Sequence, residues 1–182
     1  MPAGRRAHIR APAIEVFSVN AAGAFPAFDT AQVAARIRAC LPELQFVGGA
    51  ADLAAVQEIR SFRTPSCYVV FASAQNSGRV PDSIGQCALE MRYEFATVLA
   101  LRHYREQRGE QMRDEAQALA GKLRGALIGW RPPQPGCRVI GWQRGDVLDY
   151  DAATMLLRDE WQCFFTCERT PDEHHHHNHP QP

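Results

Sequence analysis

The strongest constraint on the fold is a strand-like segment that leads into a long helical one, between residues 92 and 130. Residues 92–104 alternate between two faces, as in a strand that is covered on one side. The more apolar face carries Tyr93, Phe95, Thr97, Leu99 and Leu101. After a turn at 106–109, an apolar stripe recurs every three or four residues, at Met112, Ala116, Leu119, Leu123, Leu127 and Trp130. This order predicts an α+β fold in which the long helix packs on the apolar face of a sheet.

Shorter elements surround this pair. A helix is predicted from an N-cap at Asp29 or Thr30 to Pro42, and a second, shorter one from Asp52 to about Arg60. Their inward residues are Val33, Ile37, Cys40 and Leu41 in the first, and Leu53, Val56 and Ile59 in the second. Further strands are predicted at 44–47, 67–73, 138–143 and 154–167. We expect a mainly antiparallel sheet of about four strands, with the long helix and one or two shorter helices packed on it.

The chain divides into three parts. Residues 1–28 are rich in Ala and Pro and predict an N-terminal arm with one short strand at 14–19. Residues 29–170 form a single α+β domain, which suits the length of 182 residues. Residues 171–182 form a polar, His-rich tail that we expect to be disordered, either a natural low-complexity segment or part of an expression tag.

Charge and hydropathy narrow the possible partners. Lys plus Arg and Asp plus Glu number 20 each, so the formal net charge is zero, which argues against specific nucleic-acid binding. The basic start is not followed by an apolar run of signal-peptide length, and no stretch approaches a membrane span. We therefore expect synthesis in the cytoplasm, no membrane partner, and reduced, mostly buried cysteines.

No pattern predicts a catalytic, cofactor or metal site. Cys163 and Cys167 lie about 13 Å apart along a strand, too far to share one ion, so they are expected to be core thiols. The run His174–His177 lies beyond the last predicted element, where no folded shell can shape it. His103 has no orienting partner nearby in sequence, and the phosphate-loop, dinucleotide and nucleophile-elbow motifs are missing. The sequence predicts a protein that is not an enzyme and needs no cofactor.

Two polar segments are candidate contact surfaces. Residues 74–90 read as a long loop, and its polar side chains Asn76, Ser77, Arg79 and Asp82 favour a contact with another protein over a catalytic lid. The segment 102–115, with Arg102 and Arg105, carries both charge signs densely. It is either a solvated surface or a polar subunit contact.

The long helix carries Gly121, Gly125 and Gly129 at every fourth position, although each glycine costs about 1 kcal/mol in a helix interior. Either this face packs closely on its own sheet, or it allows close approach of a neighbouring subunit. Trp130 closes the apolar stripe and is expected to be structural.

Three stretches of this chain resemble the tail terminator family of long-tailed bacteriophages. The first two are LPELQFVGGAADL (41–53) and EFATVLALRHYREQRGEQMRDEAQALAGKLRGALIGWRPP (94–133), which ends with the family's pattern at Ala126, Leu127, Gly129, Trp130 and Pro132. The third, GDVLDYDAATMLLRDEWQCFFT (145–166), resembles the family's final strands. The resemblance covers about residues 30–170, and the arm and the His-rich tail depart from it.

The resemblance implies a structural role in the virion. Such proteins form a ring, typically a homohexamer, on the head-proximal end of the tail tube, where they stop polymerisation and provide the head-joining surface. The implied partners are further copies of the chain, the tail tube protein and a neck or head-completion protein, with DNA passing through the ring channel. Assembly takes place in the cytoplasm of the bacterial host. The alternatives are another neck or head-completion protein, or a small α+β enzyme or ligand-binding domain, which a monomer with a deep pocket would favour.

Overall fold

Two long antiparallel strands form the centre of the computed structural model, which describes residues 17–19, 27–56, 58–78, 87–102, 109–150 and 154–169. Strand β4 (Cys87–Arg102) pairs with β6 (Thr154–Arg169) along the full length of both. Strand β3 (Ser66–Asn76) pairs antiparallel with β4, and β5 (Gly141–Tyr150) pairs antiparallel with β6. The three-residue strands β2 (Phe46–Gly48) and β1 (Phe17–Val19) add parallel pairings to β3 and β6. The sheet is mainly antiparallel, as predicted, but has six strands.

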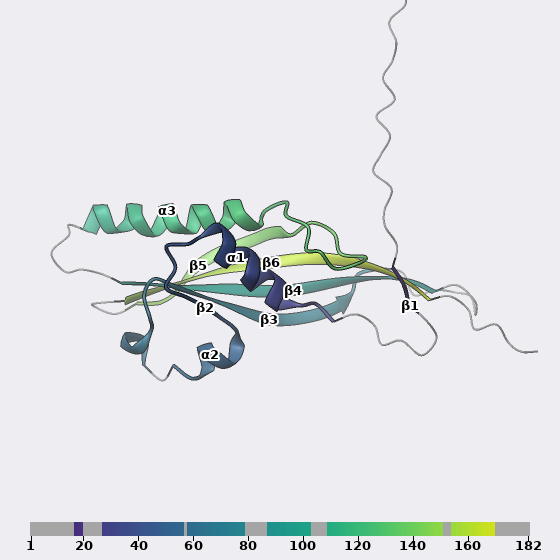
Figure 1. The fold of residues 1–182 in the computed structure, drawn as a ribbon, viewed down its shortest axis with the longest axis horizontal. Coiled ribbons are helices and arrows are strands. Elements are labelled where there is room, and N and C mark those ends of the chain that lie inside the picture. The colour runs from purple at the N-terminus through teal and green to yellow at the C-terminus, as the bar shows by residue number, and fades with distance from the viewer. Residues whose placement is uncertain are drawn as a thin grey trace, which may run out of the picture.

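The helices lie on both faces of the sheet. Helices α1 (Thr30–Cys40) and α3 (Gly109–Leu127) cover one face, and α2 (Ala50–Ala54) lies on the other, close to the short 3-10 helix η1 (Ile59–Ser61) (Figure 1). The α+β prediction is confirmed. Within the described residues, no helix is both long and apolar enough to cross a membrane.

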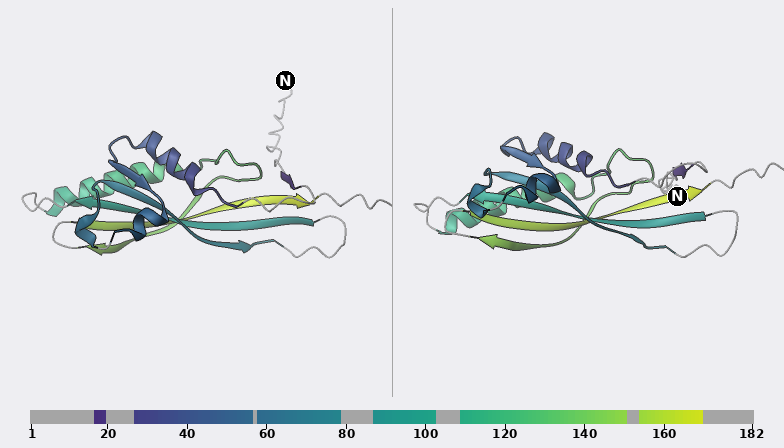
Figure 2. Two further views of the ribbon diagram at one scale, coloured as in Figure 1. Left: turned by 60° about the horizontal axis from the view of Figure 1, so that its bottom comes forward. Right: turned by 90° about the horizontal axis from the view of Figure 1, so that it is seen from below.

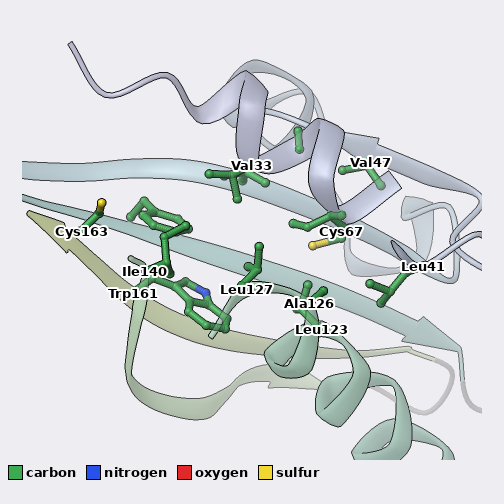
Figure 3. Packing of buried hydrophobic residues seen from close by; sticks show 14 of the residues in the cluster. Val33, Leu41, Val47, Cys67, Leu123, Ala126, Leu127, Ile140, Trp161 and Cys163 are labelled. Carbon is green, nitrogen blue, oxygen red and sulfur yellow. The ribbon is translucent and has the colours of Figure 1, made fainter. Parts of the chain in front are cut away.

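The main core lies between the sheet and helices α1 and α3. Figure 3 shows Val33 and Leu41 from the α1 region, Leu123 and Leu127 from α3, and Trp161 from β6 converging in this layer. Trp161 is fully buried, and its indole N–H donates to the buried Thr97 hydroxyl at 3.0 Å, which satisfies both polar groups. A smaller cluster on the opposite face joins Tyr68, Val98, Ala100 and Leu156 to side chains of the α2–η1 region.

Helix α1 begins and ends where the sequence predicts. The Asp29 carboxylate caps it by accepting the Ala31 N–H at 2.9 Å. Val33 and Ile37 are fully buried, and Leu41 follows them into the core. Cys40 is exposed, so its predicted inward position is wrong. The buried stripe advances by four residues at each step, which turns position 40 away from the sheet.

The single helix predicted from Asp52 to about Arg60 is wrong. Helix α2 ends at Ala54, and the chain continues through the separate turn η1. Asp52 is not the N-cap residue but the third residue of α2, where its carboxylate accepts the Gly49 N–H at 2.8 Å. Leu53, Val56 and Ile59 are only partly buried. Because few apolar side chains of this segment are buried, packing does not stabilise one continuous helix across it.

The two ends of the loop predicted at 74–90 belong to the β3–β4 hairpin. Strand β3 continues to Asn76 and β4 begins at Cys87, so both ends of the predicted loop are paired. Strands β4 and β6 run on past the helices (Figure 2). Ala74, Gln75 and Asn76 are all exposed, so this part of β3 lacks the alternating burial that marks a strand.

Trp130 lies outside α3, which ends at Leu127. Gly129 adopts a left-handed φ of 75°, and this redirects the chain after the helix. The Trp130 ring is only partly buried against the core, with the Arg36 guanidinium carbon 5.7 Å from its centroid. The structural role predicted for Trp130 therefore belongs more strongly to Trp161.

We predict a clear difference between alanine substitutions of these two tryptophans. Trp161→Ala should lower the free energy of unfolding by about 3–5 kcal/mol, because it opens a cavity and leaves Thr97 without its donor. Trp130→Ala should cost about 1–2 kcal/mol, since part of its ring is already in water. Chemical denaturation of both variants measures the difference. Equal losses would mean that the 128–140 connection depends on Trp130 as strongly as the core depends on Trp161.

Candidate subunit and tail interface

Exposed apolar side chains concentrate on β5 and the residues just before it. Val139, Trp142, Val147 and Leu148 are between 40 and 53 % exposed. The other large exposed apolar side chains in the described chain are Phe71 on β3 and Ile128 just after α3. Strand β5 pairs only with β6, so its outer edge carries no strand in the described structure. An unpaired edge with exposed apolar side chains is typical of a surface that another chain covers.

Trp142 is held in place by a buried carboxylate. Asp159, 5 % exposed, accepts the Trp142 indole N–H at 3.0 Å. It also accepts both Nε and Nη2 of Arg124 from helix α3, with the shortest contact at 2.8 Å. The Arg124 guanidinium carbon lies 4.9 Å from the Trp142 ring centroid, within cation–π range. The three side chains together fix the edge strand to the helix and fix the orientation of an exposed tryptophan.

Gly145 leaves the space that this network occupies. A Cβ atom at position 145 would collide with Asp159 Oδ1 and would lie 2.7 Å from Arg124 Nη2. Gly141, earlier on the same strand, differs, since a Cβ there would make ordinary contacts of 3.6–3.7 Å with Gln162. The glycine at 145 is therefore required by the carboxylate–guanidinium pair and not by strand geometry.

The opposite face of β5 and β6 carries a charged ladder. Arg144 forms two hydrogen bonds with Glu160, at 2.7 and 2.8 Å, and Arg158 pairs with Asp146 at 2.8 Å. The hydrogen bond from Arg158 lowers the pKa of Asp146, and the bond from Arg144 lowers the pKa of Glu160. These pairs are solvent-exposed, so each contributes little to stability. They keep this face of the sheet polar and its charges paired.

The outer face of α3 carries small residues beside the exposed Gln117 and Lys122. Ala118, Gly121 and Gly125 are exposed, and a Cβ added at either glycine would meet nothing within 4 Å. Close packing of these glycines on their own sheet, one of the two interpretations of their spacing, is therefore wrong. Exposed Ile128 continues the same face. The other interpretation, close approach of a neighbouring subunit, stays a prediction.

The other predicted interface residues do not gather in one place. Asn76 and Ser77 serve the hairpin itself, because Asn76 Oδ1 accepts the Gly78 N–H at 3.0 Å and the Ser77 hydroxyl hydrogen-bonds Glu90. Arg102 is exposed at the far end of β4, eleven residues beyond Met91, the partner of Asn76. Arg79, Asp82 and Arg105 lie outside the described residues. The hairpin and Arg102 are thus separated by most of the sheet.

Two buried thiols are in contact, one from the segment before β5 and one from β6. Cys137 Sγ lies 3.0 Å from Cys163 Sγ, and both residues are at most 1 % exposed. The hydrogen bond to Cys163, and then burial, raise the pKa of the Cys137 thiol well above its usual range. Burial raises the pKa of Cys67 to about 12.

The core position predicted for Cys163 agrees with its burial. The predicted His174–His177 run lies outside the described residues. The described part of the chain contains no cluster of three potential metal ligands.

Sequence reasoning missed the residues that shape the edge of the sheet. Asp159, Arg124 and Trp142 are distant in sequence, and only strand register brings them together. Position 142 fell inside a predicted strand, but the sequence carries no signal that its side chain would be exposed. The glycine spacing on α3 was the one signal that pointed to an open surface.

A comparison with protein-family models gives one match. The model described as "Phage tail terminator protein" matches residues 24–172, more than half of the chain. The matched segment begins just before Phe28, whose ring stacks on Phe95 in the core, and extends past the end of β6. No curated protein matches the chain.

Substitutions at the two glycines of β5 test the Asp159 network. We predict that Gly145→Ala lowers the free energy of unfolding by about 1–3 kcal/mol, because the new Cβ displaces the carboxylate or the guanidinium. Gly141→Ala is the matched control and should be neutral or slightly stabilising. Urea titration of both variants measures this. A neutral Gly145→Ala would contradict the proposed tight fit around Asp159.

Thiol reactivity tests the burial of the cysteine pair. In the folded protein at neutral pH, Cys40 should react with a maleimide rapidly, because it is exposed. Cys67, Cys137 and Cys163 should be protected until the protein unfolds, because all three thiols are buried. The raised pKa values of Cys67 and Cys137 lower the reactivity of these two thiols further. Peptide mapping after timed labelling assigns each site. Labelling of Cys137 as fast as Cys40 would show that the 131–140 segment opens readily.

Proposed function

The chain belongs to the phage tail terminator family, and from this premise we propose that it forms a ring of six copies on the head-proximal end of the tail tube. The ring stops polymerisation of the tube and provides the surface on which the head joins. The family match over residues 24–172 carries this proposal, because it includes the helices and the central strands of the sheet. The family is structural, which supports a role without catalysis.

The outer face of α3 supports self-association. Glycines in the middle of a helix are unfavourable, and those at 121 and 125 relieve no contact within the subunit. A face of Ala118, Gly121, Gly125 and Ile128 instead allows the backbone of another chain to approach closely. We assign this face to the contact between neighbouring copies.

The remaining contacts follow from the proposed position of the ring. One face of the ring meets the tail tube protein, and the other meets a neck or head-completion protein. Asn76, Ser77, Arg79 and Asp82 from the segment 74–90 are proposed for these contacts, together with Arg102 and Arg105. The net charge of zero suits a channel through which DNA passes without being held. Assembly in the host cytoplasm and incorporation into the virion complete the proposal.

A capping assay tests this function directly. Purified chain added to polymerising tail tube protein should arrest elongation, and phage lacking the gene should produce overlong, headless tails in electron micrographs. The second candidate is a neck or head-completion protein, which the same family resemblance to small tail proteins favours. That protein would leave tube length unchanged and bind the portal side. Tails of normal length made without the chain would overturn the terminator role.

Enlarging the glycines of α3 should separate folding from assembly. The variant Gly121→Gln/Gly125→Gln should raise the free energy of unfolding by about 1 kcal/mol, because helix propensity improves and nothing is displaced. The added side chains should block the neighbouring copy, so tube capping is lost. Gly121→Ala/Gly125→Ala is the control with small side chains at the same positions, and it should stabilise the fold while retaining more of the capping. Full capping by the Gln variant would exclude this face from the ring contact.

A further inference from the structure

Four aromatic residues form one row across the sheet. Phe71 on β3 is the register partner of Phe95 on β4, Phe95 is the partner of Trp161 on β6, and Trp161 is the partner of Trp142 on β5. Directly paired residues share a face of the sheet, so all four side chains lie on the side of helices α1 and α3. The two central rings are at most 1 % exposed and stack at 6.2 Å, whereas Phe71 is 46 % and Trp142 40 % exposed. The row is buried in the middle and open at both ends.

The open ends coincide with the two free edges of the sheet. Strand β2 covers the outer edge of β3 only at Ser66–Tyr68, and from Val69 onward no described strand pairs with the edge of β3 that faces away from β4. Strand β5 pairs only with β6. Phe71 and Trp142 are therefore the outermost residues of the row at opposite edges of one subunit.

The geometry of the edges suits a cyclic contact. Each of the pairings β3–β4, β4–β6 and β6–β5 is antiparallel, so β5 runs opposite to β3. Rotation about an axis roughly along the strands keeps strand direction, so β5 of one copy would meet β3 of the next in antiparallel orientation. Phe71 and Trp142 lie at the same level along the strands, which needs no shift along the axis. A contact without axial rise closes into a ring, and one with axial rise continues as a helix.

The ends of the aromatic row, Phe71 and Trp142, favour contact through side chains over a continuous ladder of backbone hydrogen bonds between subunits. The register shifts next to the row on both edges, between Phe71 and Ser73 and between Trp142 and Arg144. Such bulges interrupt strand pairing and protect edges from unspecific association. Trp142 is already oriented by Asp159 and Arg124, so little side-chain freedom is lost when a partner packs on it. The neighbours of Phe71, exposed Ala72 and Ala74, are small and uncharged, which leaves access to its ring.

We propose that Trp142 of one copy packs against Phe71 of the next, so that the aromatic row continues from subunit to subunit around the ring. The occupant of each open edge is thus a second copy of this chain. The inference rests on the proposed function, which supplies the ring, and adds the residues that join it.

Paired cysteines test the contact in the full-length chain. In a Cys40→Ser background, Phe71→Cys/Trp142→Cys should give a ladder of covalent oligomers up to the closed ring when oxidised with tail tubes present. Each single substitution should give no ladder beyond a dimer, because a head-to-tail contact needs both thiols in every copy. Phe71→Cys/Val147→Cys is the matched control and should give no ladder. Val147 lies on the same strand and is 51 % exposed, against 40 % for Trp142. Its register partner on β6 is Leu157, so it lies outside the aromatic row.

The substitution Trp142→Cys also removes the contacts of this tryptophan with Asp159 and Arg124. A second variant therefore tests the contact and leaves Trp142 unchanged. Phe71→Asp changes a side chain that is 46 % exposed and contacts Tyr93, so the monomer should stay folded with a thermal midpoint lowered by only a few degrees. Its capping activity should fall on the order of tenfold or more, as for a central aromatic contact. Capping by Phe71→Asp at the wild-type level, or a wild-type ring without the 71–142 ladder, would overturn this contact and leave the terminator role intact. A wild-type chain that neither associates nor caps tubes would overturn both.

Discussion

The full-length pairing of β4 with β6 is the constraint on which the rest of the structure depends. It joins Cys87–Arg102 to Thr154–Arg169 and puts Phe95 beside Trp161 at the centre of the core. Strands β3 and β5 attach to its two sides, and α1 and α3 close over the face that carries these rings (Figure 1). Because the two strands are distant in sequence, the core forms only when the chain between them, including α3, has folded back across the sheet.

Burial explains which elements could be predicted from the sequence. Helix α1 and residues 93–97 of β4 carry side chains with one buried face, so their periodicity is visible. The outer half of β3 and most of β5 expose both faces, from Ala74 to Asn76 and from Trp142 to Asp149. Hydrogen bonds to a neighbouring strand hold these segments, and backbone pairing leaves no pattern in side-chain polarity. That is why 74–90 resembled a loop and why only the last three residues of the strand predicted at 138–143 belong to β5, which continues to Tyr150.

The candidate interface was predictable only in part for a related reason. The spacing of Gly121 and Gly125 indicated an unusual helix face, but only coordinates distinguish internal packing from an open surface. Asn76, Ser77 and Arg102 were chosen for their polarity, which does not reveal that the strands separate them. The role of Trp142 depends on three pairings of strand register and on the buried carboxylate of Asp159. A change of one residue in the register would turn Trp142 to the charged face of Arg144 and Glu160.

The free edges of β3 and β5 also suggest how a ring of this chain would stop adding subunits. A subunit with a free β5 edge and a free β3 edge has two different surfaces, and such head-to-tail contacts either close or continue indefinitely. In the proposed ring every β5 edge meets a β3 edge, so no apolar strand edge remains to recruit further copies. The bulges beside Phe71 and Trp142 make ladder formation at the edges unfavourable before closure. The paired charges of Arg144, Asp146, Arg158 and Glu160 keep the β5–β6 part of the opposite face polar, so that part offers little to further copies. In this proposal, closure without axial rise ends the assembly at a fixed number of subunits, because both strand edges of every copy are then occupied.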